Sequence, residues 1–376
     1  MILSQDTVER LNNMVLFDDT ETDFITRLQN HQERFIEMVN QSELDDLLDI
    51  EFVKKIYDIG IKCTQCYLEG QLEESIKIIE SNFWGDELDE RMLESFHHPI
   101  YVEENELILF RLRKNDCSRL FNSSEMFHIA FENRSKVSNQ RYSYAGYPCL
   151  YLGSSIYGCW EETGRPNVDM FNVIAVKNAD FITFIDLRVP NFSKDTNVTD
   201  IDIYHAIITW LCSFKAANKD VPFIVEYVIP QMIVSSFVKN FNKRRKIQGY
   251  YRNAIPMGIA YTSSTYYEPT RLFDERELFT NYVIPVVVHK PKGLCDILCK
   301  KFKITETTSI LKERITKNTF EVILGYEGER DSYEFTEFGS LERTMSSRNF
   351  SFIQDKYICP LPEHEEVELM NILSRK

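Results

Sequence analysis

The stretch Arg141-Tyr-Ser-Tyr-Ala-Gly-Tyr-Pro-Cys-Leu-Tyr-Leu152 decides how the chain can fold. Gly146 marks a turn, and the apolar run Cys149–Leu152 that comes after it is typical of a short strand. A helix is expected to begin next, from Ser154 or Ser155, because serine is a preferred helix N-cap. A turn, a strand and a helix in direct succession predict a mixed α+β region.

The same mixture of strands and helices continues on both sides of this stretch. The predicted strands are short runs rich in β-branched and aromatic residues. They are Leu107–Phe110, Phe171–Val176, Phe181–Asp186, Phe223–Val228, Met257–Tyr261, Tyr282–Val288 and Thr319–Leu324. The predicted helices are Ile201–Lys215, Gln231–Asn240 and a terminal helix, Glu363–Leu373.

The first 98 residues contain no proline and are predicted to be all helical. Apolar residues recur there at three- and four-residue spacing, which is the period of an amphipathic helix. Ser42, followed by an acidic first turn, is typical of an N-cap. The predicted helices are Thr7–Phe17, Thr22–Met38, Glu73–Phe83 and Asp86–Phe96.

The negative charge of the chain is concentrated in this helical part. Residues 1–100 hold 8 Lys+Arg and 23 Asp+Glu, whereas residues 101–376 hold 35 of each, so the first quarter accounts for the whole net charge of −15. An acidic surface repels phosphate backbones, so no nucleic-acid partner is expected. We interpret the acidic face as a solvated surface or, alternatively, as a docking surface for a basic partner.

Composition and the change of pattern together predict three parts: an acidic all-helical domain (1–98), a mixed α+β domain (99–295) and an α/β extension packed on it (296–376). The chain has 376 residues, of which 43% are hydrophobic, so it can bury a sizeable core. No run of 18 apolar residues occurs, Met1–Asp6 does not resemble a signal peptide, and the nine cysteines form no dense framework. A cytoplasmic protein with reduced thiols and no membrane partner is expected.

Five short pieces of the sequence occur in an order that resembles the RES family, which is named for its Arg, Glu and Ser. They are Phe110-Arg111, Arg141-Tyr142 with its glycine turn, Leu150-Tyr151-Leu152, Glu162 on the following helix, and Gly258-Ile-Ala-Tyr-Thr-Ser263. Arg141 lies ten residues before Tyr151, and Glu162 lies eleven residues after it. The resemblance covers about residues 107–290. It implies a fold similar to ADP-ribosyltransferase toxins and an enzyme that consumes NAD⁺.

The resemblance implies that NAD⁺ is the substrate, with no separate cofactor, and that a glycohydrolase or phosphorylase breaks its nicotinamide–ribose bond. Cleavage of this kind develops oxocarbenium-like positive charge that a carboxylate stabilises, and we expect Glu162 to do so. Arg111 and Arg141 are expected to bind the pyrophosphate, because guanidinium groups pair with phosphate. Tyr151 is expected to stack on the nicotinamide, and Ser263 to hydrogen-bond its amide or the ribose.

Two positions and the acceptor of the reaction stay open. Glu161 directly precedes Glu162, and Ser264 follows Ser263; spacing favours Glu162 and strand register favours Ser263. The acceptor is water or phosphate or, in an ADP-ribosyltransferase, a macromolecule. A non-enzymatic dinucleotide-binding protein is the further alternative.

An enzyme of the toxin or defence-effector kind requires control. The resemblance therefore implies an antitoxin or regulatory protein as a partner, and a homo-oligomer is a further expectation. The acidic helical domain is expected to occlude the pocket or to bind that partner. Arg91 and His97 have the spacing of helical ribonuclease domains of the HEPN type, which accompany some RES proteins. Met92 stands where that pattern has a polar residue, so a helical role without nuclease activity is favoured.

Two further patterns are interpreted as structural. The pairs Cys63/Cys66 and Cys295/Cys299 offer four thiols, but C-x-x-x-C is an unusual zinc half-site, so buried thiols and no metal are expected. The basic run Lys243–Lys246 is interpreted as a solvated loop or a contact to dinucleotide phosphate. No Gly-x-Gly-x-x-Gly fingerprint occurs, so hydride transfer is not supported.

Overall fold

The computed structural model describes residues 1–16, 22–84, 89–115, 119–167, 170–244, 256–268, 271–309, 312, 333 and 336–353. The predicted strand Thr319–Leu324, the predicted helix Glu363–Leu373 and the second half of the basic run, Arg245–Lys246, lie outside these residues. None of the helices in the described part of the chain is both long and apolar enough to cross a lipid bilayer.

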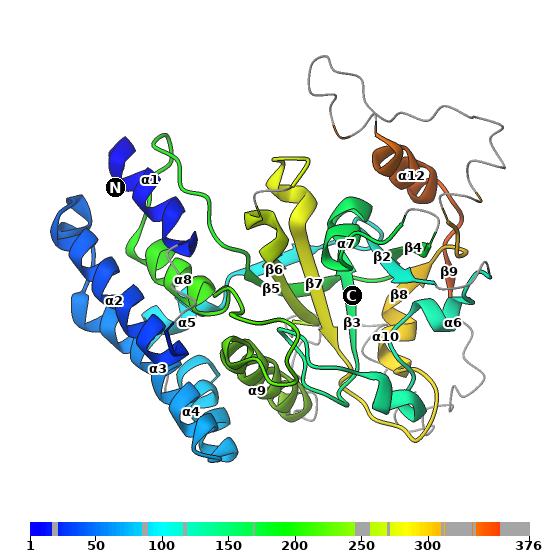
Figure 1. Cartoon of the computed structure of the whole chain (residues 1–376), viewed down its shortest axis with the longest axis horizontal. Coiled ribbons are helices and arrows are strands. Elements are labelled where there is room, and N and C mark those ends of the chain that lie inside the picture. The colour runs from blue at the N-terminus through cyan, green and yellow to red at the C-terminus, as the bar shows by residue number, and fades with distance from the viewer. Residues whose placement is uncertain are drawn as a thin grey trace, which may run out of the picture.

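The N-terminal part is helical, as the sequence predicts, and lies on one side of the molecule (Figure 1). Its helices are α1 (Gln5–Asn13), α2 (Phe24–Asn40), α3 (Ile50–Leu68), α4 (Leu72–Phe83) and α5 (Glu90–Phe96), with the 3₁₀ helices η1 (Met14–Leu16) and η2 (Glu43–Asp46) between them. Short polar side chains begin most of these helices by accepting a backbone N–H, which satisfies an otherwise unpaired donor. These caps are Ser4, Asp23, Ser42, Asp49 and Asp89.

A mixed sheet of nine strands follows, which confirms the expected α+β class. Its strands are β1 (Pro99–Val102), β2 (Ile108–Lys114), β3 (Cys149–Gly153), β4 (Phe171–Asn178), β5 (Ile182–Leu187), β6 (Gly258–Thr262), β7 (Thr280–Pro285), β8 (Phe302–Ile304) and β9 (Ser351–Phe352). The order across the sheet is β1-β5-β6-β7-β3-β2-β4-β8-β9, and only the β5–β6 pair is parallel among the described strands. Strands β3 and β6 are both antiparallel to β7. The C-terminal ends of β3 and β6 therefore lie beside the N-terminal end of β7, at the same end of these three strands.

The segment predicted as a strand at Phe223–Val228 is not a strand. It forms the 3₁₀ helix η4 (Val225–Tyr227) and the beginning of α9 (Val228–Arg244). A short apolar run fits a buried strand and a buried helix equally well, so periodicity cannot separate them. In α9 the apolar residues are buried on several sides, as Val228, Ile233 and Phe237 show.

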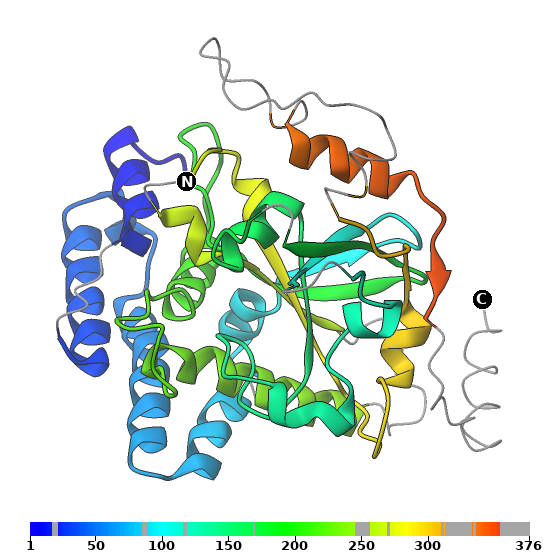
Figure 2. The same cartoon turned by 45° about the vertical axis from the view of Figure 1, so that its right-hand side comes forward.

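Two buried helices, α8 (Asp200–Leu211) and α9, join the N-terminal helices to the sheet (Figure 2). Helix α8 contacts α3 and α5, and α9 contacts α3 and α4. One continuous hydrophobic core runs from α1 through α8 and α9 into the sheet. Residues on both sides of the predicted boundary at residue 98 therefore contribute to one core.

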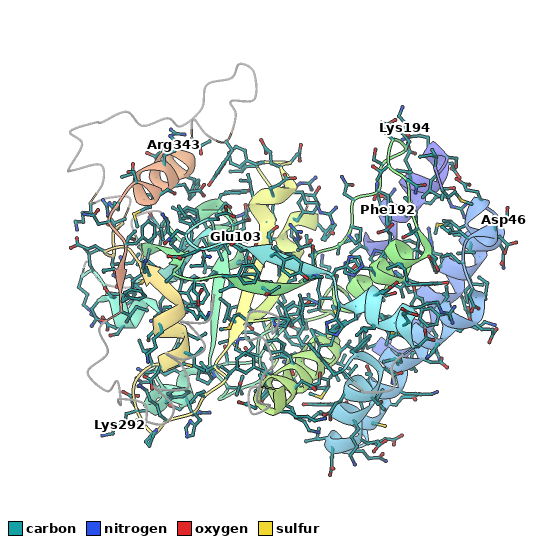
Figure 3. The ribbon with its side chains drawn as sticks, turned by 180° about the vertical axis from the view of Figure 1, so that it is seen from behind. Asp46, Glu103, Phe192, Lys194, Lys292 and Arg343 are labelled. Carbon is teal, nitrogen blue, oxygen red and sulfur yellow. The ribbon has the colours of Figure 1, made fainter. Side chains whose placement is uncertain are left out.

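Figure 3 shows the molecule from behind, with Phe192 and Lys194 on the side of the N-terminal helices and Lys292 at the far end of the sheet. Asn12 of α1 holds the segment around Phe192 by donating to its carbonyl (3.0 Å) and accepting from its N–H (2.8 Å). The remaining elements surround the sheet. They are α6 (Ser123–Met126), η3 (Phe131–Lys136), α7 (Ile156–Glu162), η6 (Ser264–Tyr267), η7 (Arg276–Phe279), α10 (Asp296–Lys301) and α12 (Glu337–Ser346).

Candidate active site

Helix α7 begins directly after β3 and is held tightly against the start of β7. Ser155 is its N-cap: the hydroxyl accepts from the Gly158 N–H (2.7 Å) and donates to the Leu278 carbonyl (2.6 Å). A Cβ on Gly158 would lie 2.3 Å from the same Leu278 oxygen, so only glycine permits this approach. Because residues four apart share a helix face, Glu162 faces the strand ends as Gly158 does.

The Glu162 carboxylate is held by two donors from the strand ends. Its Oε1 accepts from the Ser263 hydroxyl (2.5 Å), which comes directly after β6, and from the Asn281 side-chain amide (2.7 Å) in β7. Ser263 is fully buried and Asn281 is nearly so, whereas Glu162 is exposed as a whole residue. One carboxylate oxygen is therefore fixed by the protein while the side chain borders solvent. A substrate can approach such a group.

The neighbouring carboxylate, Glu161, has a different environment. It is buried and accepts from the Tyr157 hydroxyl (2.5 Å) and from Arg165 Nε (2.7 Å), with which it forms an ion pair. Successive helix residues point about 100° apart, so Glu161 and Glu162 cannot both face the strand ends. The sequence left open the choice between Glu161 and Glu162 and between Ser263 and Ser264. In the structure, Glu162 and Ser263 are the two that contact each other.

Arg141 lies on the other side of the site, against the end of α8. Its Nη1 donates to the carbonyls of Cys212 (3.0 Å) and Phe214 (2.9 Å), and its guanidinium lies 4.9 Å from the centre of the Tyr227 ring. Arg141 is 9% exposed, and its Nη2 is buried without a hydrogen-bond partner among the described residues. A buried cationic N–H with no acceptor is costly unless a ligand supplies one.

The charges of Glu162 and Arg141 both affect the pKa values of two tyrosines, Tyr227 and Tyr261. Burial raises the pKa of Tyr261 well above its usual range; the Glu162 carboxylate adds to the rise, and the Arg141 guanidinium opposes it. The pKa of Tyr227 is also raised by burial, lowered by Arg141 and raised by Glu162. Glu162 and Arg141 make no direct contact with each other in the hydrogen bonds and ion pairs of the described residues. Both charges act electrostatically on the same two phenol groups.

The other two predicted residues, Tyr151 and Arg111, meet along β3. The Tyr151 hydroxyl donates to Ser143 Oγ (2.9 Å), and Arg111 Nη1 donates to the Tyr151 carbonyl (2.7 Å). Strands β2 and β3 pair at a single position, Phe110 with Gly153, and Arg111 bridges the strands beside it. Burial lowers the pKa of Arg111 to about 10, which leaves it charged at neutral pH. Arg111 is thus bound to backbone, and the structure does not bring it into contact with Glu162.

Three residues of the site were not predicted as site residues: Asn281, Tyr261 and Tyr227. Asn281 and Tyr261 are paired in register on β7 and β6, so they lie side by side next to Glu162. The polar Asn281 at the start of an apolar strand is a signal that could have identified it as a site residue. Tyr227 carried no usable signal, because its segment was predicted as a strand.

The weaker patterns lie elsewhere and have structural partners. Arg91 pairs with Asp49 (2.9 Å), and His97 Nε2 is hydrogen-bonded to the Phe83 carbonyl (3.0 Å). Burial raises the pKa of Cys63 to about 12, which disfavours a thiolate. No group of three or more His, Cys, Asp or Glu side chains within the described ranges could hold a metal ion. A surface hollow of about 720 Å³ between α2, α3 and α4 contains none of the predicted site residues.

Comparison with known proteins gives one similarity in sequence and one in structure. No protein-family model matches the chain. It is 32% identical over 256 residues to the Bacillus subtilis (strain 168) protein named "Putative toxin YopC", which is 62% of this chain. The chain spans about half the length of that curated relative (54%). The M. tuberculosis MbcT–MbcA toxin–antitoxin complex contains a chain that aligns with a TM-score of 0.29 and 11% identity, over 56% of this chain and 86% of that one.

Proposed function

We propose that this protein degrades NAD⁺ by cleaving its nicotinamide–ribose bond, in a RES-type domain with an ADP-ribosyltransferase-like fold. The observation that carries the proposal is the Glu162 carboxylate, held by Ser263 and Asn281 at the ends of the strands. Arg141, with an unpaired Nη2, lies against the Tyr227 ring and supplies the positive charge that the proposal needs. Two of the motif residues, Glu162 and Ser263, are in contact, which supports the proposal.

The reaction needs only a few groups from the protein. The bond between ribose C1′ and the nicotinamide nitrogen breaks, and its electron pair leaves with nicotinamide, which becomes neutral. Positive charge spreads over C1′ and the ring oxygen, and the Glu162 carboxylate stabilises it. Water or phosphate then bonds to C1′; water gives up one proton in doing so. Because the leaving group starts as a cation, it needs no general acid.

Charge and aromatic area in the site suit the rest of the dinucleotide. The unpaired Nη2 of Arg141 offers a donor to a phosphate oxygen, since guanidinium–phosphate bonds are charge-assisted. The phenol rings of Tyr151, Tyr227 and Tyr261 are expected to give flat surfaces for the nicotinamide. Arg111 remains a candidate phosphate ligand through its unpaired Nε. The printed name of YopC is consistent with a toxin role, which we propose for this chain too.

Incubation of the purified protein with NAD⁺ tests the proposal. Free nicotinamide is measured by chromatography, with and without phosphate, for the wild type, Glu162→Gln and Glu161→Gln. We expect Glu162→Gln to lower the rate by roughly 10²–10³-fold, as for other lost transition-state contacts. Glu161→Gln is the matched control, because its partners are Tyr157 and Arg165, and we expect its rate to stay within a few-fold of the wild type.

The products identify the acceptor. ADP-ribose or ADP-ribose 1″-phosphate would indicate water or phosphate, respectively. Transfer of label from NAD⁺ to protein or nucleic acid in a lysate would replace the proposal with an ADP-ribosyltransferase. If the wild type and Glu162→Gln consume NAD⁺ equally, the assignment of Glu162 is wrong. Binding of NAD⁺ without any turnover would indicate a non-enzymatic dinucleotide-binding protein.

A further inference from the structure

The segment between α8 and α9, residues 212–227, is bound by an arginine on each side. Arg141, in the candidate active site, binds the Cys212 and Phe214 carbonyls and lies against the Tyr227 ring. Arg27, from helix α2 of the N-terminal part, binds the adjacent Lys215 carbonyl (2.6 Å) and the carboxylate of Glu226. Residues that are adjacent in this segment thus contact two different guanidinium groups, those of Arg141 and Arg27.

The ion pair between Arg27 and Glu226 is buried. The side chains of Arg27 and Glu226 are 1% and 3% exposed. Glu226 Oε1 also accepts from the Ala217 N–H (2.9 Å), so the carboxylate holds both ends of the segment together. The Phe214 ring packs 5.5 Å from Phe24 and 5.7 Å from the Arg27 guanidinium.

An ion pair this deeply buried is poorly explained by stability. Desolvation of two charges offsets most of their attraction, and apolar residues of similar volume often replace such pairs without loss of stability. What the pair supplies is geometry, because Arg27 fixes a carbonyl and a carboxylate at opposite ends of the segment. Phe214 and Tyr227, which Arg141 contacts, are the immediate neighbours of Lys215 and Glu226, which Arg27 contacts.

We propose that Arg27 and Glu226 are positioning residues for Arg141, so that helix α2 sets the place of the phosphate-binding arginine. This inference rests on the proposed role of Arg141 in binding NAD⁺. If Arg27 positions Arg141, the N-terminal helices contribute to NAD⁺ binding. They act through the segment 212–227 and touch no substrate.

The double variant Arg27→Met/Glu226→Leu tests the proposal, because it removes both charges while keeping side-chain volume. We expect a thermal midpoint within a few degrees of the wild type and a KM for NAD⁺ raised roughly 10- to 100-fold, since a misplacement near 1 Å costs about that much. kcat should change less than threefold, because phosphate contacts act equally in the bound and transition states. Arg27→Lys keeps the charge but loses the fork of two donors, and its KM should be intermediate.

The control is Ser236→Ala, which removes a buried hydrogen bond from Trp84 (3.0 Å) that also joins the N-terminal part to α9. We expect its KM to match the wild type. A purely structural role for Arg27 would lower kcat, by reducing the folded fraction, and leave KM unchanged. That result would overturn the proposal.

Hydrogen exchange separates this inference from the proposed function. In the double variant the Ala217 amide and the peptide 139–147, which contains Arg141, should exchange faster than in the wild type and in Ser236→Ala. If the wild type does not cleave NAD⁺, the proposed function fails, and this exchange pattern still decides whether Arg27 positions Arg141. Unchanged exchange in the peptide 139–147 would refute the coupling.

Discussion

A single carboxylate oxygen is the most constrained atom of the site. Ser263 and Asn281 both donate to Glu162 Oε1, so the rotation of the carboxylate is fixed. Under the proposed function, the other oxygen would act on the substrate. Preorganised groups of this kind lower the barrier because they need not reorient during the reaction. Asn281 therefore belongs to the site as much as Ser263 does.

Substitutions at Asn281 test this at the residue scale. Asn281→Ala removes one donor, and we expect kcat for NAD⁺ cleavage to fall about 10²-fold with an unchanged thermal midpoint. Asn281→Asp puts a second carboxylate at hydrogen-bond distance, and like charges raise the pKa of one member. Its pH–rate profile should gain an ionisation that the wild type and Asn281→Ala lack. Identical profiles for all three would show that Asn281 does not act on Glu162.

The residues of the site could be predicted from the sequence only where a motif named them. Arg141, Tyr151, Glu162 and Ser263 stood in an ordered pattern, and the structure brings the last two into contact. Their catalytic roles stay predictions. Arg27 and Tyr227 could not be found, because a buried ion pair between residues 199 positions apart leaves no local pattern.

At the scale of elements, helix α7 depends on one glycine. Gly158→Ala would put a Cβ 2.3 Å from the Leu278 carbonyl oxygen, and a backbone atom cannot move aside easily. We expect a loss of about 1–3 kcal/mol in the free energy of unfolding, as for other overpacked sites, and lower NAD⁺ cleavage because Glu162 shifts with the helix. Gly60→Ala is the control: its Cβ would meet the flexible tips of Ile229 and Leu211 at 3.1–3.3 Å. Urea unfolding that ranks the two variants equally would contradict this reading.

Helix α12 packs on α7 and inserts Glu342 at the beginning of that helix. Its Oε1 accepts from the Ile156 N–H (2.5 Å) and from the Tyr333 hydroxyl. Burial raises the pKa of Glu342 from its ordinary value of 4.5 to about 7, although both hydrogen bonds oppose the rise. The folded protein therefore holds a proton that the unfolded chain releases between these pH values.

The pH dependence of stability follows from this proton. The free energy of unfolding should fall as pH rises from about 5 to about 7 and then level off, and Glu342→Gln should lack this component. The difference between wild type and variant should change by roughly 2–3 kcal/mol between pH 5 and pH 8. Urea titrations of both proteins at the two pH values measure it. A constant difference would show that Glu342 titrates normally.

The sequence predicted many of the individual helices and strands, but not the segment before α9 or the order of the strands in the sheet. Several amphipathic segments and β-branched runs were identified correctly, since each period is readable within the element itself. Helix α3 and the short strands β1, β8 and β9 were not among the predicted elements. The run at residues 223–228 was misread because a strand and a buried helix need the same apolar residues. The order of the nine strands depends on contacts between distant segments, which no local pattern encodes.

For the whole molecule, the shared core decides how separable its parts are. Helix α8 is buried around most of its circumference, since every residue from Ile203 to Leu211 is buried. Deleting residues 1–98 would expose its outer face and that of α9. We expect the shortened chain to aggregate or to lose near-ultraviolet circular dichroism, and size-exclusion chromatography checks this. A monomeric, folded fragment would support the boundary at residue 98 as a true domain limit.

The first 100 residues carry the whole net negative charge, and their described helices lie at one end of the molecule (Figure 1), so the charge is unevenly distributed. Approaching molecules are oriented by the field of such a charge distribution before they touch. Under the proposed function, an anionic dinucleotide would be repelled by the helical end, whereas a basic protein would be attracted to it. Both effects weaken as added salt shortens the range of the field to about 10 Å at 0.1 M. Association rates of the two kinds of ligand should therefore respond to ionic strength in opposite directions.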